Sequence, residues 1–333
     1  MHALPAIRKS DPAYSSTITA VVNSHSIRSL LCAAALSVAA ACSSGPEKRQ
    51  EPVSLLGAPL VVPPMSEGRQ KWLELELEAA MAAWEFQPNE MHAIWVGRRL
   101  AYLGRYPEAI AWYLGALQTY TDSYRLRRHA GHRLLTVRRV DDAIAALTEA
   151  RSLAAAEPNR LEPDGAPGPS GEPRSSTHGN IDYHLALAHY VKGDFDAAAD
   201  LWLTCVRAWA MNDDARVAAL HWAFTSLVRA GRAEEAAAAL ELVPTDPDVI
   251  ENFAYADLVQ LYRGELSVDV LLERENRSAA LDYGIARFLI ASGDTARGAP
   301  LLRRLAESPG WTSFGVLAAE ADLAGELGRV KAE

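Results

Sequence analysis

The sequence has few cysteines, and their positions exclude a disulfide framework. Of its 3 Cys, Cys32 and Cys42 lie within or directly after an N-terminal apolar run, and Cys205 lies in a segment with helical periodicity. Small secreted domains that rely on disulfides carry an even set of cysteines at suitable spacings. We therefore expect no disulfide, and we expect Cys205 to be a core residue in a small-residue position rather than a reactive thiol.

Basic charge and catalytic motifs are also scarce. The chain has 33 Lys and Arg against 42 Asp and Glu, a formal net charge of -9. Generic nucleic-acid binding needs a basic surface, so this class of function is excluded. The sequence contains no Ser nucleophile elbow, no P-loop and no dinucleotide fingerprint. We therefore predict a protein that is not an enzyme and needs no cofactor.

No apolar run is long enough to span a bilayer, but one is typical of a secretory signal. Arg28 precedes 13 uncharged residues, 29–41, whereas a membrane-spanning helix needs about 20. Small residues lead to Cys42, and Ser43 follows it. The pattern resembles a bacterial lipoprotein signal, although Ala39 stands where Leu is commonest. The alternative is an ordinary secretory signal cleaved near residue 41.

The lipoprotein resemblance implies a location and an anchor. Residues 1–41 would be the removed signal peptide, and Cys42 would carry the lipid. The protein would then be anchored in the cell envelope and face the periplasm or the exterior; Ser43 after the cysteine favours the outer membrane in a Gram-negative host. Residues 42–66 are rich in Pro and Gly and are predicted to form a tether between lipid and folded domain.

A 34-residue repeat organises the rest of the chain. The pairs separated by this interval are Gly97 and Gly131, Ala109 and Ala143, Ile110 and Ile144, and Ala116 and Ala150. A small residue, a turn and an Ala-Ile pair at this period are typical of the tetratricopeptide repeat, a helix-turn-helix unit. The chain thus resembles bacterial tetratricopeptide-repeat lipoproteins.

This resemblance implies an all-α fold. We predict a right-handed α-solenoid over residues 67–330, with about six helix-turn-helix units and capping helices at its ends. Residues 157–180 contain five Pro and four Gly and no apolar periodicity, which predicts a loop insert. A helical pattern starts near residue 67 and ends at Pro88, and this helix is expected to cover the open end of the array. Its apolar residues at three- and four-residue steps form a stripe of Trp72, Leu75, Ala79, Ala82 and Phe86.

The repeat register also predicts which side chains face the concave side. These positions are rich in Arg, His and aromatic residues although the protein is acidic. The candidates are Trp95, Arg98, Tyr102, Arg125, Arg128, His129, His132, Tyr183, His184, Tyr190, His221, Trp222 and Tyr255. Arg pairs bidentately with carboxylates, and aromatic rings supply rigid contact area. We predict a groove that binds a peptide or protein partner, with an anionic or carboxylate-terminated segment as its ligand.

Three other interpretations stay open. The aromatic residues could be inter-helix packing, with the Arg residues paired to neighbouring carboxylates. The His residues could form a small-molecule or metal-dependent binding site or an enzyme, but His129 and His132 lack the spacing and the intervening Glu of a zinc protease, and no metal site is predicted. The protein could also act through its convex face.

Overall fold

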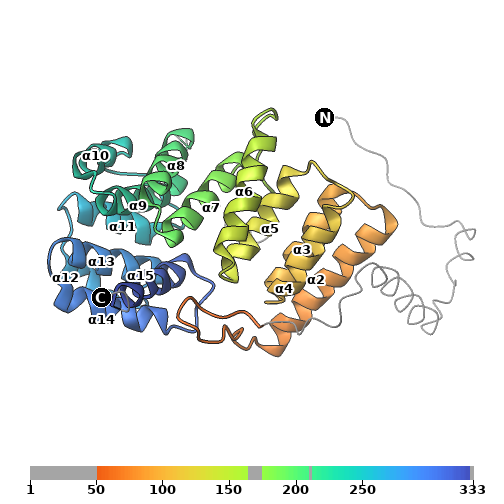
Figure 1. Ribbon diagram of the computed structural model, residues 1–333, viewed down its shortest axis with the longest axis horizontal. Coiled ribbons are helices and arrows are strands. Elements are labelled where there is room, and N and C mark those ends of the chain that lie inside the picture. Colours follow the sequence, from red (N-terminus) through yellow and green to blue (C-terminus); the bar gives the residue numbers. More distant parts are fainter. Residues whose placement is uncertain (1–50, 164–174, 210–211, 331–333) are drawn as a thin grey trace, which may run out of the picture. The chain divides into compact units, whose positions relative to one another are not determined.

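The computed structural model describes residues 51–163, 175–209 and 212–330, and the regular structure in these ranges is helical (Figure 1). Helices α2 (Glu67–Phe86) and α15 (Phe314–Val330) flank six consecutive helix pairs. The pairs are α3 (Glu90–Tyr102) with α4 (Tyr106–Ala116), α5 (Tyr124–Thr136) with α6 (Val140–Ala154), α7 (Thr177–Lys192) with α8 (Phe195–Ala208), α9 (Asp213–Arg229) with α10 (Ala233–Ala239), α11 (Phe253–Tyr262) with α12 (Val268–Leu272), and α13 (Ala279–Ala291) with α14 (Thr295–Ala306). The predicted all-α solenoid is confirmed. The predicted signal peptide and Cys42 lie outside the described residues.

The predicted register is confirmed by the first two pairs. Helices α3 and α5 begin 34 residues apart, and so do α4 and α6. A Cβ atom on Gly97 would lie 2.2 Å from the Tyr113 ring, and one on Gly131 would lie 2.5 Å from Cγ of Leu147. Each glycine therefore lets the second helix of its pair approach the first closely. The first helices of successive pairs also pack on each other, α3 on α5 and α5 on α7, and form the inner layer.

One turn breaks the rule followed by the others. The turn after the first helix of a pair holds a glycine in the left-handed region, for example Gly104 at φ 74° and Gly193 at φ 88°. The second pair has Arg138 there, at φ 67°, which costs a non-glycine residue about 1 kcal/mol or more. Its guanidinium lies 2.5 Å from Glu320 on α15 and also donates to the Trp311 carbonyl at 2.8 Å. The buried ion pair with Glu320 therefore offsets the backbone strain that a glycine would avoid at this turn.

The N-terminal segment differs from its prediction as a tether. From residue 51 onward it is part of the folded body: the Leu55 N–H donates to Glu320 at 3.1 Å, and the Trp311 indole N–H donates to the Val61 carbonyl at 2.7 Å. Leu55 and Leu60 also pack against the core. The prolines here shape a short turn on the C-terminal helices, and the part of the predicted tether before residue 51 lies outside the described residues.

Helix α2 packs on α3 at the end of the array, as predicted, but through a different face from the predicted apolar stripe. It buries Leu73 and packs Leu77, Met81 and Trp84 against the core of the first pair. The predicted stripe lies on the opposite side, with Trp72 59% and Phe86 90% exposed. Larger side chains on the other face decide the orientation, because Trp84 reaches both Trp112 and Tyr120 in edge-to-face contacts.

The C-terminal helix α15 returns to the middle of the array. It packs on α7 and α13 as well as on its neighbour α14 (Figure 1). Phe314 at its start contacts the rings of Tyr183 and His184, and Asp322 accepts a hydrogen bond from Tyr283 at 3.0 Å. The inner side of α7 and α9 is therefore covered by the chain itself.

Candidate partner-binding groove

The N-terminal half of the inner layer holds a cavity of about 240 Å³. Its walls come from α3, α5 and the two described ends of the 157–180 insert. Arg98 on α3 and Arg125 and His129 on α5 form one side, and Arg160 and Glu162 of the insert form the other. Four charged side chains from three segments thus meet around one space.

Backbone hydrogen bonds hold the ends of the insert together. Leu161 and Ser176 form an isolated antiparallel bridge. The Glu162 N–H donates to the Ser175 carbonyl, and the Thr177 N–H donates to the Arg160 carbonyl, both at 2.9 Å. Ser176 also caps α7 by accepting from the Gly179 N–H. The insert therefore leaves and rejoins the solenoid at one point, which places Glu162 over α5.

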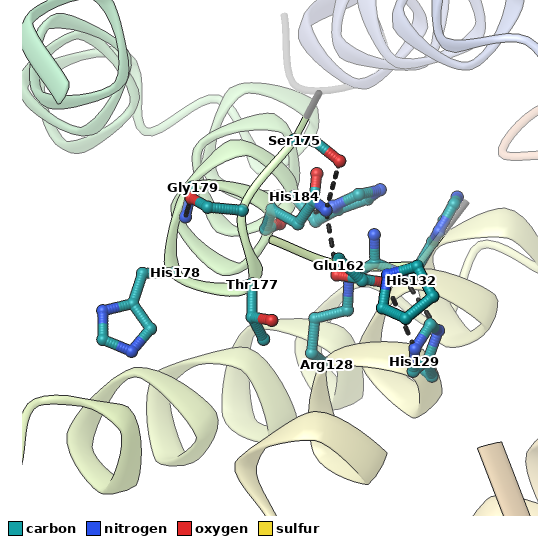
Figure 2. A network of polar contacts seen from close by, with 12 residues as sticks. Arg128, His129, His132, Glu162, Ser175, Thr177, His178, Gly179 and His184 are labelled. Carbon is teal, nitrogen blue, oxygen red and sulfur yellow. Dashed lines mark hydrogen bonds and ion pairs between the residues drawn. The ribbon is translucent and has the colours of Figure 1, made fainter. Parts of the chain in front are cut away.

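Glu162 is the centre of a buried polar network (Figure 2). Its carboxylate lies 3.2 Å from Nε of Arg128 and 3.2 Å from Nε2 of His129. The Asn180 amide donates to the same carboxylate at 2.9 Å. Because Arg128 Nη1 donates to Nδ1 of His129 at 3.0 Å, the imidazole proton is on Nε2 and points to Glu162.

The charge of this network comes from Arg rather than from His. Burial and the neighbouring Arg128 hold the pKa of His129 well below its ordinary value, so the imidazole is neutral near pH 7. Arg98 lies over the Trp95 ring, with its guanidinium carbon 4.7 Å from the ring centre, and donates to the Pro163 carbonyl at 2.5 Å. The cavity is thus lined by cationic side chains, and one carboxylate of the chain already lies among them.

The predicted site residues fall into three groups. The first group lies on α3 and α5 and is brought together at or beside this cavity: Trp95, Arg98, Tyr102, Arg125, Arg128 and His129. Tyr102 belongs here through its hydroxyl, which accepts from Arg98 at 3.2 Å. These six predicted residues are therefore brought together, and Glu162 of the insert lies among them.

The second group is His132, Tyr183 and His184, which the structure places under α15. The rings of His132 and His184 are 4.0 Å apart, and Phe314 contacts both. Burial, with Arg133 near His132 and Arg128 near His184, holds the pKa of each imidazole well below its ordinary value. These residues pack against the C-terminal helix and do not line the cavity.

The third group is Tyr190, His221, Trp222 and Tyr255. Trp222 and His221 are fully buried, and the Tyr190 hydroxyl meets the Tyr283 hydroxyl at 2.6 Å. Tyr255 is half-buried, with its ring 5.3 Å from that of His221. The prediction of an open groove here is corrected, because α11, α13 and α15 cover this part of the inner layer.

Two predictions about reactive groups can be compared with the structure. Cys205 is buried, and burial raises the pKa of its thiol well above the ordinary value, so its prediction as a core residue is confirmed. Among the residues that the structure describes, no three His, Cys, Asp or Glu side chains are grouped so as to hold a metal ion. Over the same residues, no helix is long and apolar enough to cross a membrane.

Sequence reasoning missed the insert's contribution to the site. Arg160 and Glu162 lie in the Pro/Gly-rich segment, whose composition marks a loop and gives no register. The predicted loop was wrong at its end, because α7 begins at Thr177 and carries Asn180 in its first turn. Only the excess of Arg on the inner face was a signal that a carboxylate could be nearby. Which carboxylate meets it depends on how the insert folds back, and no local pattern encodes this.

No family model matches the chain, and no curated protein matches it. Among solved structures it is similar to a chain in a structure of Naa15/Naa10 bound to HypK-THB, with 19% identity over 76% of this chain and 37% of that one, and a TM-score of 0.36. It is also similar to a chain of the APC/C hetero-tetramer Cut9-Hcn1, with 12% identity, 78% and 62% coverage and a TM-score of 0.36. The chain spans less than two thirds of the length of either. Its own repeat spacing and helix pairs define it as a tetratricopeptide-like α-solenoid.

Proposed function

We propose that this protein is a non-catalytic scaffold that binds a carboxylate-bearing segment of a partner protein in the cavity between α3, α5 and the insert. The observation that carries the proposal is Glu162 itself. A carboxylate of the chain is held there by Arg128, His129 and Asn180, so the site's chemistry already accommodates this group.

The remaining cavity has room and charge for a second carboxylate. Arg98, Arg125 and Arg160 line about 240 Å³ beside the Glu162 network. Arg125 lies 3.5 Å from Glu90, which is a long ion pair, and its side chain is 24% exposed. Its guanidinium can therefore turn to a ligand at little cost, because weak surface pairs contribute about 1 kcal/mol or less. An extended acidic segment or a free C-terminus fits these requirements.

The binding test uses labelled peptides and the full-length chain with Cys42→Ser. Fluorescein-labelled nonapeptides with one to three glutamates or a free C-terminal carboxylate are titrated by anisotropy, each beside its glutamine or amide twin. We expect the acidic peptides to bind at least tenfold more tightly than their neutral twins, and the difference to shrink as salt is raised. The double variant Arg98→Ala, Arg125→Ala should lose this preference.

Two exposed arginines outside the site supply a matched control. Arg207→Ala with Arg303→Ala removes the same charge from α8 and α14, and both residues are exposed. This control should bind like the parent chain. Equal loss in both double variants would mean that only overall charge matters, and unchanged binding in the cavity variant would overturn the proposal.

We further propose that the protein is a lipoprotein of the cell envelope, anchored through Cys42. The support is the sequence alone: 13 uncharged residues that end in small side chains and lead directly to this cysteine. Expressed in a Gram-negative host, the protein should gain the mass of a diacylglyceryl and acyl modification and sediment with membranes. Cys42→Ser should appear in the soluble envelope fraction, and an unmodified Cys42 in membrane-bound protein would contradict the proposal.

A further inference from the structure

Helix α2 lies at one end of the array and has two apolar faces, of which the fold uses one (Figure 1). The used face carries Leu73 and Trp84. The other face leaves Trp72 59%, Leu75 52% and Phe86 90% exposed. Apolar surface of this size on one helix is unusual for a side of a protein that meets only water.

The exposed residues follow the seam of a coiled coil. They recur at alternating steps of three and four residues, which is the a/d pattern of a heptad repeat. The seam consists of Trp72, Leu75, Ala79, Ala82 and Phe86. A helix with a 3.5-residue seam is suited to lie along a second helix with the same geometry. The spacing therefore indicates that the exposed face of α2 binds another helix rather than an irregular segment.

We infer that this occupant is α2 of a second copy of the chain, packed antiparallel. In an antiparallel pair centred on residue 77, each large seam residue meets a small one, which is how facing positions fill space without overlap. The facing pairs are Trp72 with Ala82, Leu75 with Ala79, and Phe86 with Gly68. A parallel pair would instead set Trp72 against Trp72 and leave gaps at the alanines.

Charge selects the same orientation. The first turns of α2 carry Arg69 and Lys71, and the rest of the helix carries acidic residues up to Glu85. Antiparallel packing brings Lys71 of one copy beside Glu85 of the other at both ends of the seam, whereas in a parallel pair the acid opposite Lys71 would be Glu76, which is already paired with Arg99 of its own chain. Glu78 would face its own copy at the centre, and this repulsion keeps the association weak and reversible.

The net negative charge of α2 also argues against a membrane surface as the partner of its exposed face. Five glutamates, residues 67, 74, 76, 78 and 85, stand against Arg69 and Lys71. Interfacial helices that bind anionic lipids carry Lys and Arg on the polar face. Glu76 forms an ion pair within the chain, with Arg99 at 2.6 Å.

Sedimentation velocity of the full-length chain with Cys42→Ser, over a hundredfold concentration range, tests the inference. The parent should pass from monomer to dimer, and Leu75→Glu with Phe86→Glu should stay monomeric throughout. Leu114→Glu with Val270→Glu alters exposed apolar residues elsewhere, 43% and 48% exposed, and should dimerise like the parent. Melting curves establish that all three chains are folded. A parent that stays monomeric, or a seam variant that still dimerises, overturns the inference.

Charge reversal tests the orientation. Lys71→Glu or Glu85→Lys alone should weaken the dimer at least tenfold, and the double variant should restore it. In a parallel pair these residues would be roughly 21 Å apart along the helix, so no restoration would occur and the antiparallel geometry would be wrong. Co-sedimentation of the monomer with phosphatidylglycerol vesicles, lost in the seam variant, would make a lipid surface the occupant instead.

Discussion

Both halves of the inner layer pair arginine side chains with a buried carboxylate, but the carboxylate comes from a different kind of segment in each half. In the N-terminal half, Arg128 on α5 meets Glu162, which comes from a loop insert. In the C-terminal half, Arg229 on α9 and Arg287 on α13 meet Asp322, which comes from the last helix. Both carboxylates are buried. Glu162 itself borders the cavity that Arg98, Arg125 and Arg160 line, whereas the cavity of about 220 Å³ in the C-terminal half is lined by Arg229 and Arg287 but not by Asp322.

This difference separates structure from candidate function. Asp322 also accepts from Tyr283, whose hydroxyl meets that of Tyr190, so four helices depend on it. Glu162 joins α5 to a short bridge between the ends of a loop. A loop can be moved by a ligand at lower cost than a terminal helix packed into the core. The N-terminal half is therefore the half in which binding can occur without unfolding.

The largest expected effect comes from neutralising Asp322. Asp322→Asn keeps the shape but removes the buried carboxylate that neutralises both Arg229 and Arg287, and removing one partner of a buried pair typically costs about 3–5 kcal/mol. Urea unfolding of the variant should show this loss of free energy. Asp200→Asn, where the side chain is 68% exposed beside Arg232, should cost less than about 1 kcal/mol. A small effect at Asp322 would mean that the C-terminal half does not depend on it.

The sequence predicts the arrangement of Arg side chains but not what meets them. The 34-residue register placed Gly97, Gly131 and the inner face of α3 and α5 correctly, because local spacing determines which side of a helix faces its pair. It failed for Trp222 and Tyr190, because the return of α15 to α7 is a contact between distant segments. Contacts between distant segments produce no periodic pattern in the sequence, so they could not be predicted from it.

The second prediction concerns Arg138, which joins α5 to the C-terminal helix. Arg138→Gly restores the glycine found at the other turns and relieves about 1 kcal/mol of backbone strain, but it leaves Glu320 buried without its cation. The net expected loss is about 2–4 kcal/mol by urea unfolding. Glu320→Gln should cost a similar amount, and a double-mutant cycle should show that the two losses do not add. Additive losses would mean that the pair is not coupled.

The third prediction is a pH dependence that is stronger in the N-terminal half. Burial, reinforced by nearby arginines, lowers the pKa of His129, His132 and His184 in the folded chain, and burial lowers that of His221 to about 3. Below about pH 6.5 the histidines of the unfolded chain, with ordinary pKa values near 6.5, therefore bind protons while those of the folded chain stay neutral. Stability is full above about pH 7.5 and falls as pH decreases through 6.5.

The expected size is about 1.4 kcal/mol per histidine between pH 7.5 and 5.5. Urea unfolding at three pH values in this window measures the slope. Removing one buried histidine with His132→Gln should make the decline shallower. Equal slopes in the parent and His132→Gln would contradict a neutral His132.

The smallest expected effect on stability comes from Glu162. It tests most directly whether the Glu162 site differs in function from the Asp322 site of the C-terminal half. Glu162→Gln removes the counter-charge of one arginine, Arg128, whereas Asp322→Asn removes that of two, so we expect a smaller cost of about 1–2 kcal/mol. Glu157→Gln changes an exposed acid at the start of the same insert and should cost almost nothing. The same Glu162→Gln chain should bind acidic peptides more tightly than the parent, because a negative charge that borders the cavity lined by Arg98, Arg125 and Arg160 is removed. A loss as large as that of Asp322→Asn, without a gain in peptide affinity, would mean that both carboxylates are structural and that the two halves do not differ in function.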